Sequence, residues 1–187
     1  PLLETYVKEV LTRFADDDRI LAWDLYNEPT NGGLAFRSMP LLRKVVKWAR
    51  EVEISQPVTI GVWSGDEELR RFSIDNSDIV SFHCYSDAAY TREMCRQLKA
   101  ENRPVICTEW MNRPTGSTIA SVLPVFAEEG VGCMLWGLVN GKTQTDLPWG
   151  HRPEHGEYTG PWQHDIFWGD FTPYDPSEID LLKKYCK

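Results

Sequence analysis

Two glutamates that each end a strand-like run are the residues of this sequence best suited to chemistry. The apolar, β-prone run over residues 20–28 closes in Asn27-Glu28-Pro29, and the proline ends the strand because it cannot donate a ladder hydrogen bond. A second strand-like run later in the chain also ends on a glutamate, Glu109. Two carboxyl groups at the ends of two strands of one sheet are the minimum set for glycoside hydrolysis.

The elements that must position these glutamates alternate regularly along the chain. Apolar spacing predicts helices over residues 3–14, 40–52, 66–72, 88–100, 117–129 and 176–185, and strands over residues 20–28, 58–63, 79–85, 104–109 and 132–139. A long loop is expected over residues 140–175. Apolar strands that alternate with amphipathic helices predict an α/β fold whose parallel sheet is covered on both faces.

The bulk composition narrows the class of protein. The 187 residues fit a single domain over residues 1–187 with a sizeable core. Acidic residues outnumber basic ones by 28 to 20, which gives a net charge of −8. The sequence shows no basic stripe, so nucleic acid is not an expected partner. No signal peptide is visible, and no apolar run is long enough to span a bilayer, so no membrane partner is expected.

Aromatic and cysteine residues add two further expectations. Eight tryptophans, seven tyrosines and seven phenylalanines make up 12% of the chain, and flat tryptophan faces suit sugar rings, although most tryptophans pack in cores. The cysteines are odd in number and show no metal-ligand spacing: Cys84, Cys95, Cys107, Cys133 and Cys186. We expect most of them to be small buried residues rather than disulfide partners.

Motifs at four predicted strand ends resemble a known family. Asn27-Glu28-Pro29 is similar to an acid/base motif at the end of barrel strand four, and His83-Cys84-Tyr85 to a His-x-Tyr motif at the end of strand six. Glu109, within Thr108-Glu109-Trp110, matches the nucleophile at the end of strand seven, and Trp136 matches a strand-eight tryptophan that floors the sugar site. In this order the motifs resemble clan A retaining glycoside hydrolases, most closely the family 5 cellulase-like (β/α)8 enzymes.

The resemblance implies a TIM barrel of which this chain carries the C-terminal five βα units, strands four to eight. The arginine and histidine that the family's early strands contribute have no counterpart here. Five strands cannot close the usual eight-stranded barrel. We therefore expect the missing N-terminal half-barrel, or self-association, to complete it.

The resemblance also implies roles for the site residues. Glu109 would be the nucleophile, and Glu28 would donate a proton and then act as base, with its pKa raised by the nearby Glu109 charge. Asn27 would bind the sugar 2-hydroxyl, Tyr85 would donate a hydrogen bond to Glu109, and His83 would bind a sugar hydroxyl or orient a carboxylate. The competing interpretation is that the glutamates cap amides at loop starts and that Asn27 forms a turn.

Tryptophans could supply the sugar-binding surface. Trp136 is the expected stacking platform, and Trp63, Trp110 and Trp149 could line further subsites. We expect core packing for at least one of these three, and for Trp23, which lies within a predicted strand.

The expected function is retaining hydrolysis of β-linked polysaccharide or oligosaccharide by an O-glycosyl hydrolase of cellulase-, mannanase- or xylanase-like type, which needs no cofactor and no metal. A secreted or periplasmic location is implied by the resemblance alone. One rival is a non-catalytic carbohydrate-binding or assembly fragment of a barrel. Another is a metal-dependent hydrolase that uses His151, His155 and His164 with Asp146 nearby. Pro153 and Gly156 argue against the helical spacing that a zinc site there would need, and a solvated loop is the favoured interpretation.

Overall fold

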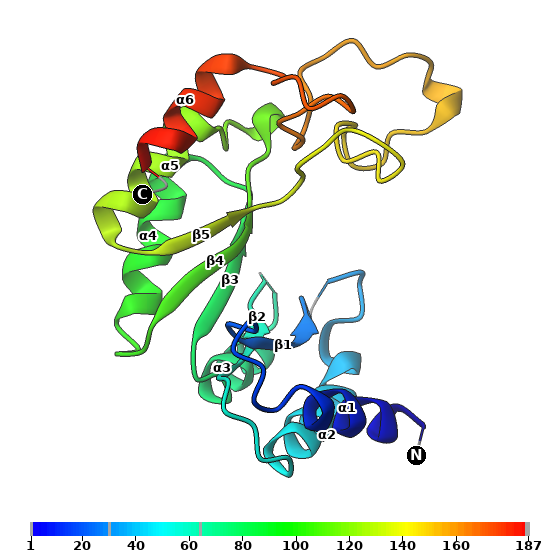
Figure 1. Cartoon of the computed structure of the whole chain (residues 1–187), viewed down its shortest axis with the longest axis vertical. Helices are drawn as coiled ribbons and strands as arrows, with labels where there is room; N and C mark the ends of the chain where they lie inside the picture. Colours follow the sequence, from blue (N-terminus) through cyan, green and yellow to red (C-terminus); the bar gives the residue numbers. More distant parts are fainter. Residues whose placement is uncertain (1, 30, 64, 186–187) are drawn as a thin grey trace. The chain divides into compact units, whose positions relative to one another are not determined.

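The structure is a computed structural model that describes residues 2–29, 31–63 and 65–185, so Cys186 lies outside the described residues. Its elements follow the order α1 (Leu2–Arg13), β1 (Trp23–Asn27), α2 (Met39–Arg50), β2 (Val58–Gly61), α3 (Glu67–Asp75), β3 (Val80–Cys84), α4 (Ala88–Lys99), β4 (Val105–Trp110), α5 (Ile119–Glu129), β5 (Gly132–Leu135) and α6 (Pro176–Tyr185) (Figure 1). Short 3-10 helices η1 (Ala35–Ser38), η2 (Arg113–Thr115) and η3 (Pro153–His155) lie in the connections. The predicted alternation of helix and strand is confirmed.

The chain divides into two compact units, which we describe separately. The first unit comprises Pro1–His83 and Asn102–Ile106, and the second comprises Cys84–Glu101 and Cys107–Lys187. Strands β3 and β4 therefore each begin in the first unit and end in the second. The single domain predicted over residues 1–187 stays a prediction.

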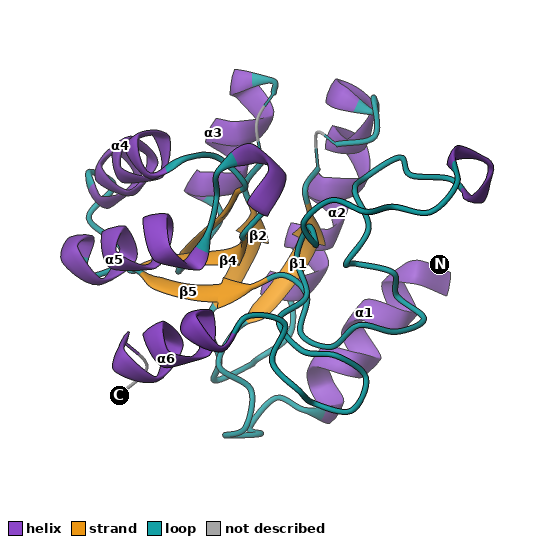
Figure 2. Ribbon diagram, turned by 90° about the horizontal axis from the view of Figure 1, so that it is seen from above, coloured by secondary structure: helices purple, strands orange, loops and turns teal. Residues whose placement is uncertain are grey.

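In the first unit, β1 and β2 form a parallel pair (Figure 2). Trp23 is opposite Val58 and Asn27 is opposite Gly61, with an irregularity in the register between them. Such an irregularity bends a strand and re-aims the side chains that follow it. The end of β1 is therefore the point where the regular ladder gives way to the loop that carries Glu28.

Buried apolar side chains of α2, α3 and β2 form the core of the first unit. These are Met39, Leu42, Val46, Ile60 and Leu69, with Leu25, Tyr26 and Phe72 packed against them. Helix α2 has a proline, Pro40, in its first turn, where its missing N–H costs no intrahelical hydrogen bond. Helix α3 begins where the Asp66 side chain accepts a hydrogen bond from the backbone N–H of Leu69.

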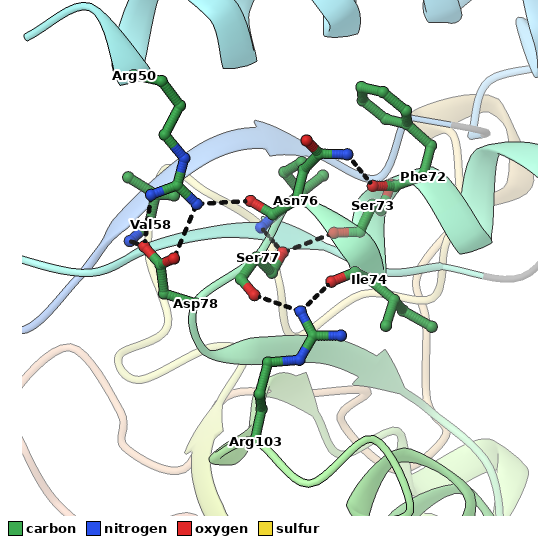
Figure 3. A network of polar contacts seen from close by, with 10 residues as sticks. Arg50, Val58, Phe72, Ser73, Ile74, Asn76, Ser77, Asp78 and Arg103 are labelled. Atoms are coloured by element: carbon green, nitrogen blue, oxygen red, sulfur yellow. Dashed lines mark hydrogen bonds and ion pairs between the residues drawn. The ribbon is translucent and has the colours of Figure 1, made fainter.

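A polar network joins the C-terminal end of α3 to the start of β2 (Figure 3). The Arg50 guanidinium contacts both carboxylate oxygens of Asp78, at 3.0 and 2.8 Å, and Asp78 accepts a hydrogen bond from the backbone N–H of Val58 at 2.9 Å. Arg103 donates to the carbonyl oxygens of Ile74 and Ser77, both at 2.6 Å. Arg50 also donates to the Asn76 carbonyl oxygen at 3.1 Å, so both cations contact carbonyl groups at the end of α3.

In the second unit, α5 contacts both α4 and α6 (Figure 1). Helix α5 begins with a capping box between Thr118 and Ser121 and ends at Gly130, whose φ of 65° is left-handed. The predicted end of this helix at residue 129 is confirmed. Strand β4 lies between β3 and β5 in a three-stranded sheet.

Strand β5 is shorter than the predicted strand over residues 132–139. It ends at Leu135 because Gly137 has a φ of 87°, which a regular strand does not adopt. A Cβ atom at Gly137 would lie 2.7 Å from His164 Cβ and 2.8 Å from Asp165 Oδ1. The chain turns there so that it can pack closely against the long loop.

Part of the long loop is buried, contrary to the expectation of a solvated loop. Residues 163–166 have exposed fractions of 2, 1, 0 and 4%. Val139 forms a parallel bridge with Phe167, and the backbone N–H of Asn140 donates to the Phe167 carbonyl at 2.8 Å. These contacts fold the second half of the loop back onto the segment that follows β5.

The described cysteines fit the prediction of small buried residues. Cys84, Cys95 and Cys107 are buried with free thiols, and Cys133 is partly buried. Burial raises the pKa of Cys95 to about 12. Across residues 2–29, 31–63 and 65–185, the helices include none with the length and apolar character needed to cross a membrane.

Candidate active site

Glu28 occupies a strained position at the end of β1 in the first unit. Its backbone has a φ of 44°, in the left-handed region that non-glycine residues seldom adopt. Its carboxylate Oε1 lies 2.5 Å from His83 Nδ1, and the Asn31 side-chain amide donates to Oε2. The residue is only 9% exposed. Backbone strain of this kind persists where the surroundings hold a residue in place, and it is common at functional sites.

The pKa of Glu28 is lowered, whereas the sequence predicted a raised one. Burial is the largest influence and raises the pKa, but the hydrogen bonds from His83 and Asn31 and the charge of His83 together outweigh it. Donors that point at the ionised carboxylate stabilise that form. The expectation was wrong in direction because the sequence did not reveal that two donors converge on this group.

His83 reaches Glu28 because β2 ends in a glycine. The His83 side chain is 1% exposed, and a Cβ atom at Gly61 would lie 3.1 Å from its Nε2. Any larger residue at position 61 would push the imidazole ring away. Of the two roles expected for His83, the contact with a carboxylate is the one the structure contains. Asn27 is exposed at the end of β1, and its contact with a sugar stays a prediction.

In the second unit, Glu109 is paired with Tyr85. The Tyr85 hydroxyl donates to Glu109 Oε2 at 2.8 Å. Glu109 lies on β4, and Tyr85 follows directly after β3. A hydrogen bond to the carboxylate stabilises its ionised form and limits its rotation, which is what a carboxylate nucleophile needs.

Two more rings surround Tyr85. The Trp149 ring meets it edge-on, with centroids 4.8 Å apart and an interplanar angle of 89°, and the His164 ring is 5.4 Å away. Trp149 remains 58% exposed. Its ring therefore packs on Tyr85 and still presents surface to solvent.

The remaining tryptophans differ in exposure. Trp136 directly follows β5 and is 42% exposed, so part of its ring is open. Trp110 is fully buried and packs against Phe126 at 5.2 Å, so its ring has no surface available for a sugar and belongs to the core. Trp63 is partly buried in the first unit, and its role stays a prediction.

Residues 2–142 match the cellulase family, glycosyl hydrolase family 5. The chain belongs to this family. No curated protein sequence matches it.

Solved structures similar to this family 5 chain include β-glucuronidases from two organisms. One from Ruminococcus gnavus has a TM-score of 0.67 and 17% identity, and the match covers 98% of this chain and 34% of that one. One from Faecalibacterium prausnitzii has a TM-score of 0.65 and 14% identity, covering 98% and 34%. The chain thus spans about a third of the length of these proteins. The fold is a partial TIM barrel of alternating β/α units with parallel strands.

The loop histidines of this family 5 chain do not form a metal site in the described residues. His164 is buried, and its Nδ1 donates to the Met111 carbonyl at 2.5 Å while its Nε2 lies 2.8 Å from the Gln163 amide. Both ring nitrogens are therefore engaged by protein groups. His151 and His155 lie with ring centroids 5.7 Å apart, and no described group of three potential ligands includes a loop histidine. The metal-dependent alternative has no support in these contacts.

The sequence analysis did not anticipate four residues that lie around Glu28 or around the Tyr85–Glu109 pair: Asn31, Gly61, Gln163 and His164. His164 was named only as a possible metal ligand, not as a residue that packs on Tyr85. Gly61, at the end of a buried strand, was the one with a usable signal, because glycine there often marks a close approach of another group. Asn31 and Gln163 lie in loops, where asparagine and glutamine have many ordinary uses.

Proposed function

We propose that this chain is the strand-four-to-eight part of a retaining glycoside hydrolase that acts on β-linked polysaccharide or oligosaccharide. One observation carries the proposal: each strand-end glutamate has its own hydrogen-bond partner from the end of β3. His83 contacts Glu28 in the first unit, and Tyr85 contacts Glu109 in the second. Glutamates that merely cap loop amides would not require such partners. Family membership supports the same chemistry.

In the proposed reaction, Glu109 attacks the anomeric carbon and forms a covalent glycosyl ester while Glu28 gives its proton to the leaving oxygen. Glu28 then takes a proton from water, whose oxygen attacks the same carbon and releases Glu109. The Tyr85 hydroxyl holds Glu109 ionised and oriented. Asn27 binds the sugar 2-hydroxyl, a contact that strengthens in the transition state.

The lowered pKa of Glu28 means that a bound sugar must help it to hold a proton. A sugar over Glu28 would exclude water, and desolvation raises the pKa of a carboxyl group. Burial is already the largest single influence on the pKa of Glu28, and it raises that pKa. Further burial by a bound sugar would raise the pKa more. The proton-donor role therefore depends on substrate binding.

Substrate and assembly follow as parts of the same proposal. Trp136 and Trp149 would stack on sugar rings, with Trp63 at a further subsite. A R. gnavus β-glucuronidase of this fold is known in complex with D-glucuronic acid, which supports a carbohydrate as the ligand here. The retaining reaction also requires the carboxyl groups of Glu28 and Glu109 to lie roughly 5–5.5 Å apart.

The first unit has surfaces suited to further barrel strands. Helix α1 leaves Leu2 and Tyr6 exposed, at 85 and 63%. In the described part of the chain, β1 has a single strand neighbour, β2. An exposed apolar helix face and a strand with one described neighbour are surfaces that a preceding half-barrel, or a second copy of the chain, would cover.

A mechanism-based label tests the function. The protein at its natural length is treated with activated 2-fluoro β-glycosides and digested, and the labelled peptide is identified by mass spectrometry. We expect the label on Glu109, and we expect Glu109→Gln to abolish both labelling and hydrolysis of an aryl β-glycoside. Glu93→Gln, the same change on the exposed side of α4, is the control. Sugar binding without label or hydrolysis would establish the non-catalytic binding protein instead.

A further inference from the structure

Gln163 and His164 form a buried pair within the long loop of the second unit. They are 2 and 1% exposed, whereas most of residues 141–161 are exposed or half-buried. Neither residue belongs to the proposed catalytic machinery. Buried polar side chains in a loop require hydrogen-bond partners, and the partners of this pair lie beside Tyr85, which donates to Glu109.

The pair takes part in a chain of three hydrogen bonds, in each of which a donor faces an acceptor. The Met111 carbonyl can only accept, so His164 Nδ1 carries the hydrogen of their 2.5 Å contact. His164 Nε2 then has a lone pair and accepts from the Gln163 amide nitrogen at 2.8 Å. The Gln163 amide oxygen accepts the backbone N–H of Trp149 at 2.7 Å. These bonds connect the end of β4 to Trp149.

The chain of bonds ends on the rings that surround the nucleophile's partner. Trp149 and His164 have ring centroids 5.2 Å apart, and both contact Tyr85, at 4.8 and 5.4 Å. Tyr85 in turn donates to Glu109. Because Trp149 is 58% exposed, its position depends strongly on its backbone, which Gln163 holds.

We propose that Gln163 and His164 are positioning residues that fix Trp149 against Tyr85, and thereby set both the sugar-binding surface and the orientation of the nucleophile. This inference rests on the proposed function. A neutral His164 is required, since only the neutral ring can accept from Gln163. Burial is the main cause that lowers the pKa of His164, in keeping with this requirement.

Gln163→Glu tests the inference by a pH signature. The new carboxylate still accepts from Trp149 but cannot donate to His164 Nε2, so two acceptors face each other. At acidic pH the imidazole gains a second proton and donates to the carboxylate, which restores the bond. We expect kcat/KM on an aryl β-glycoside, relative to the unchanged protein, to fall at pH 7.5 on the order of 100-fold, as for a misplaced site group, and to recover towards pH 5.5.

Gln163→Leu removes both bonds and provides the second variant. It should reduce kcat/KM and the rate of 2-fluoro glycoside labelling at every pH, without recovery in acid. Gln144→Glu, the same change at an exposed position of the loop, is the control. Hydrogen exchange of the Trp149 amide is measured in parallel and should accelerate in Gln163→Leu, a readout that needs no activity.

The outcomes separate this inference from the proposed function. If the unchanged protein neither labels nor hydrolyses, the proposed function fails, while the Trp149 amide still reports whether Gln163 holds that segment. If the variants lower the melting temperature but keep kcat/KM, labelling rate and pH profile, Gln163 is only a structural anchor and the inference is overturned. Unchanged amide exchange at Trp149 in Gln163→Leu overturns it as well.

Discussion

Replacing His83 by leucine should destabilise the protein in a pH-dependent way. The Glu28 and His83 side chains are 8 and 1% exposed and their polar atoms lie 2.5 Å apart. Removing His83 would leave the buried Glu28 carboxylate without one of the groups that stabilise its negative charge. Such losses cost about 3–5 kcal/mol. We expect His83→Leu to lose a free energy of unfolding of this order at pH 7.

The sign of the pH dependence follows from the lowered pKa of Glu28. A carboxyl group whose folded pKa lies below its unfolded value, near 4.5, stabilises the protein above that pH. The stabilisation is lost as the pH falls through the folded pKa, because the carboxylate must then take up a proton. In His83→Leu the main donor is absent, so the difference in stability between the two proteins should shrink on acidification.

Urea denaturation followed by circular dichroism at pH 7 and at pH 4 measures this difference. His155→Leu, the same change at an exposed loop histidine, should cost little and show no comparable pH dependence. A loss in His83→Leu that is equal at both pH values would mean that packing, not the bond to Glu28, accounts for the effect. The reasoning about the charge of Glu28 would then be refuted.

Three further outcomes follow from single contacts. Tyr85→Phe keeps the ring contacts but removes the donor to Glu109. Because a hydrogen bond to a charged group is worth about 1.5–3 kcal/mol, kcat/KM on an aryl β-glycoside should fall roughly 10- to 150-fold. An unchanged kcat/KM would contradict the role of the hydroxyl. Gly137→Ala should lower the melting temperature, because the backbone φ is 87° and the new Cβ would clash with His164 and Asp165. The free energy of unfolding should fall by at least about 1–2 kcal/mol. Gly141→Ala, where a Cβ would enter open space, is the control and should keep the melting temperature of the unchanged protein. Thiol labelling at pH 8 with peptide mapping should modify the partly exposed Cys133 before Cys95, whose pKa is about 12; the reverse order would contradict the burial of Cys95.

The order of elements could be predicted because each one is encoded locally. The apolar side of α2 repeats at helical spacing, and β2 is a short run rich in β-branched residues that the structure buries along its whole length. Turn and cap signals act over a few residues, as at Gly130. The end of β1 could be read for the same reason, because Pro29 cannot donate a ladder hydrogen bond. Strand β4 ends at Trp110, shortly before the polar residues Asn112 and Arg113 interrupt the apolar pattern.

The partners of those strand ends could not be predicted in the same way. The contact of His83 with Glu28 joins residues far apart in the chain, and it depends on space that only Gly61 leaves open. The pKa of Glu28 is lowered because two hydrogen-bond donors outweigh the effect of burial. Neither the burial of Glu28 nor the approach of the donors can be read from a sequence pattern. The burial of residues 163–166 in a polar loop was missed for a related reason, since their partners lie at the ends of other elements.

The sequence by itself therefore determined the α/β alternation, the strand ends that carry the two glutamates and the family motifs, because these features depend on short-range patterns of apolar and turn residues. Only the tertiary structure decided which groups donate to each carboxylate, which tryptophan is buried and which loop residues are held in place. Such contacts arise from packing between distant segments, where differences of a few ångströms decide whether a donor meets an acceptor.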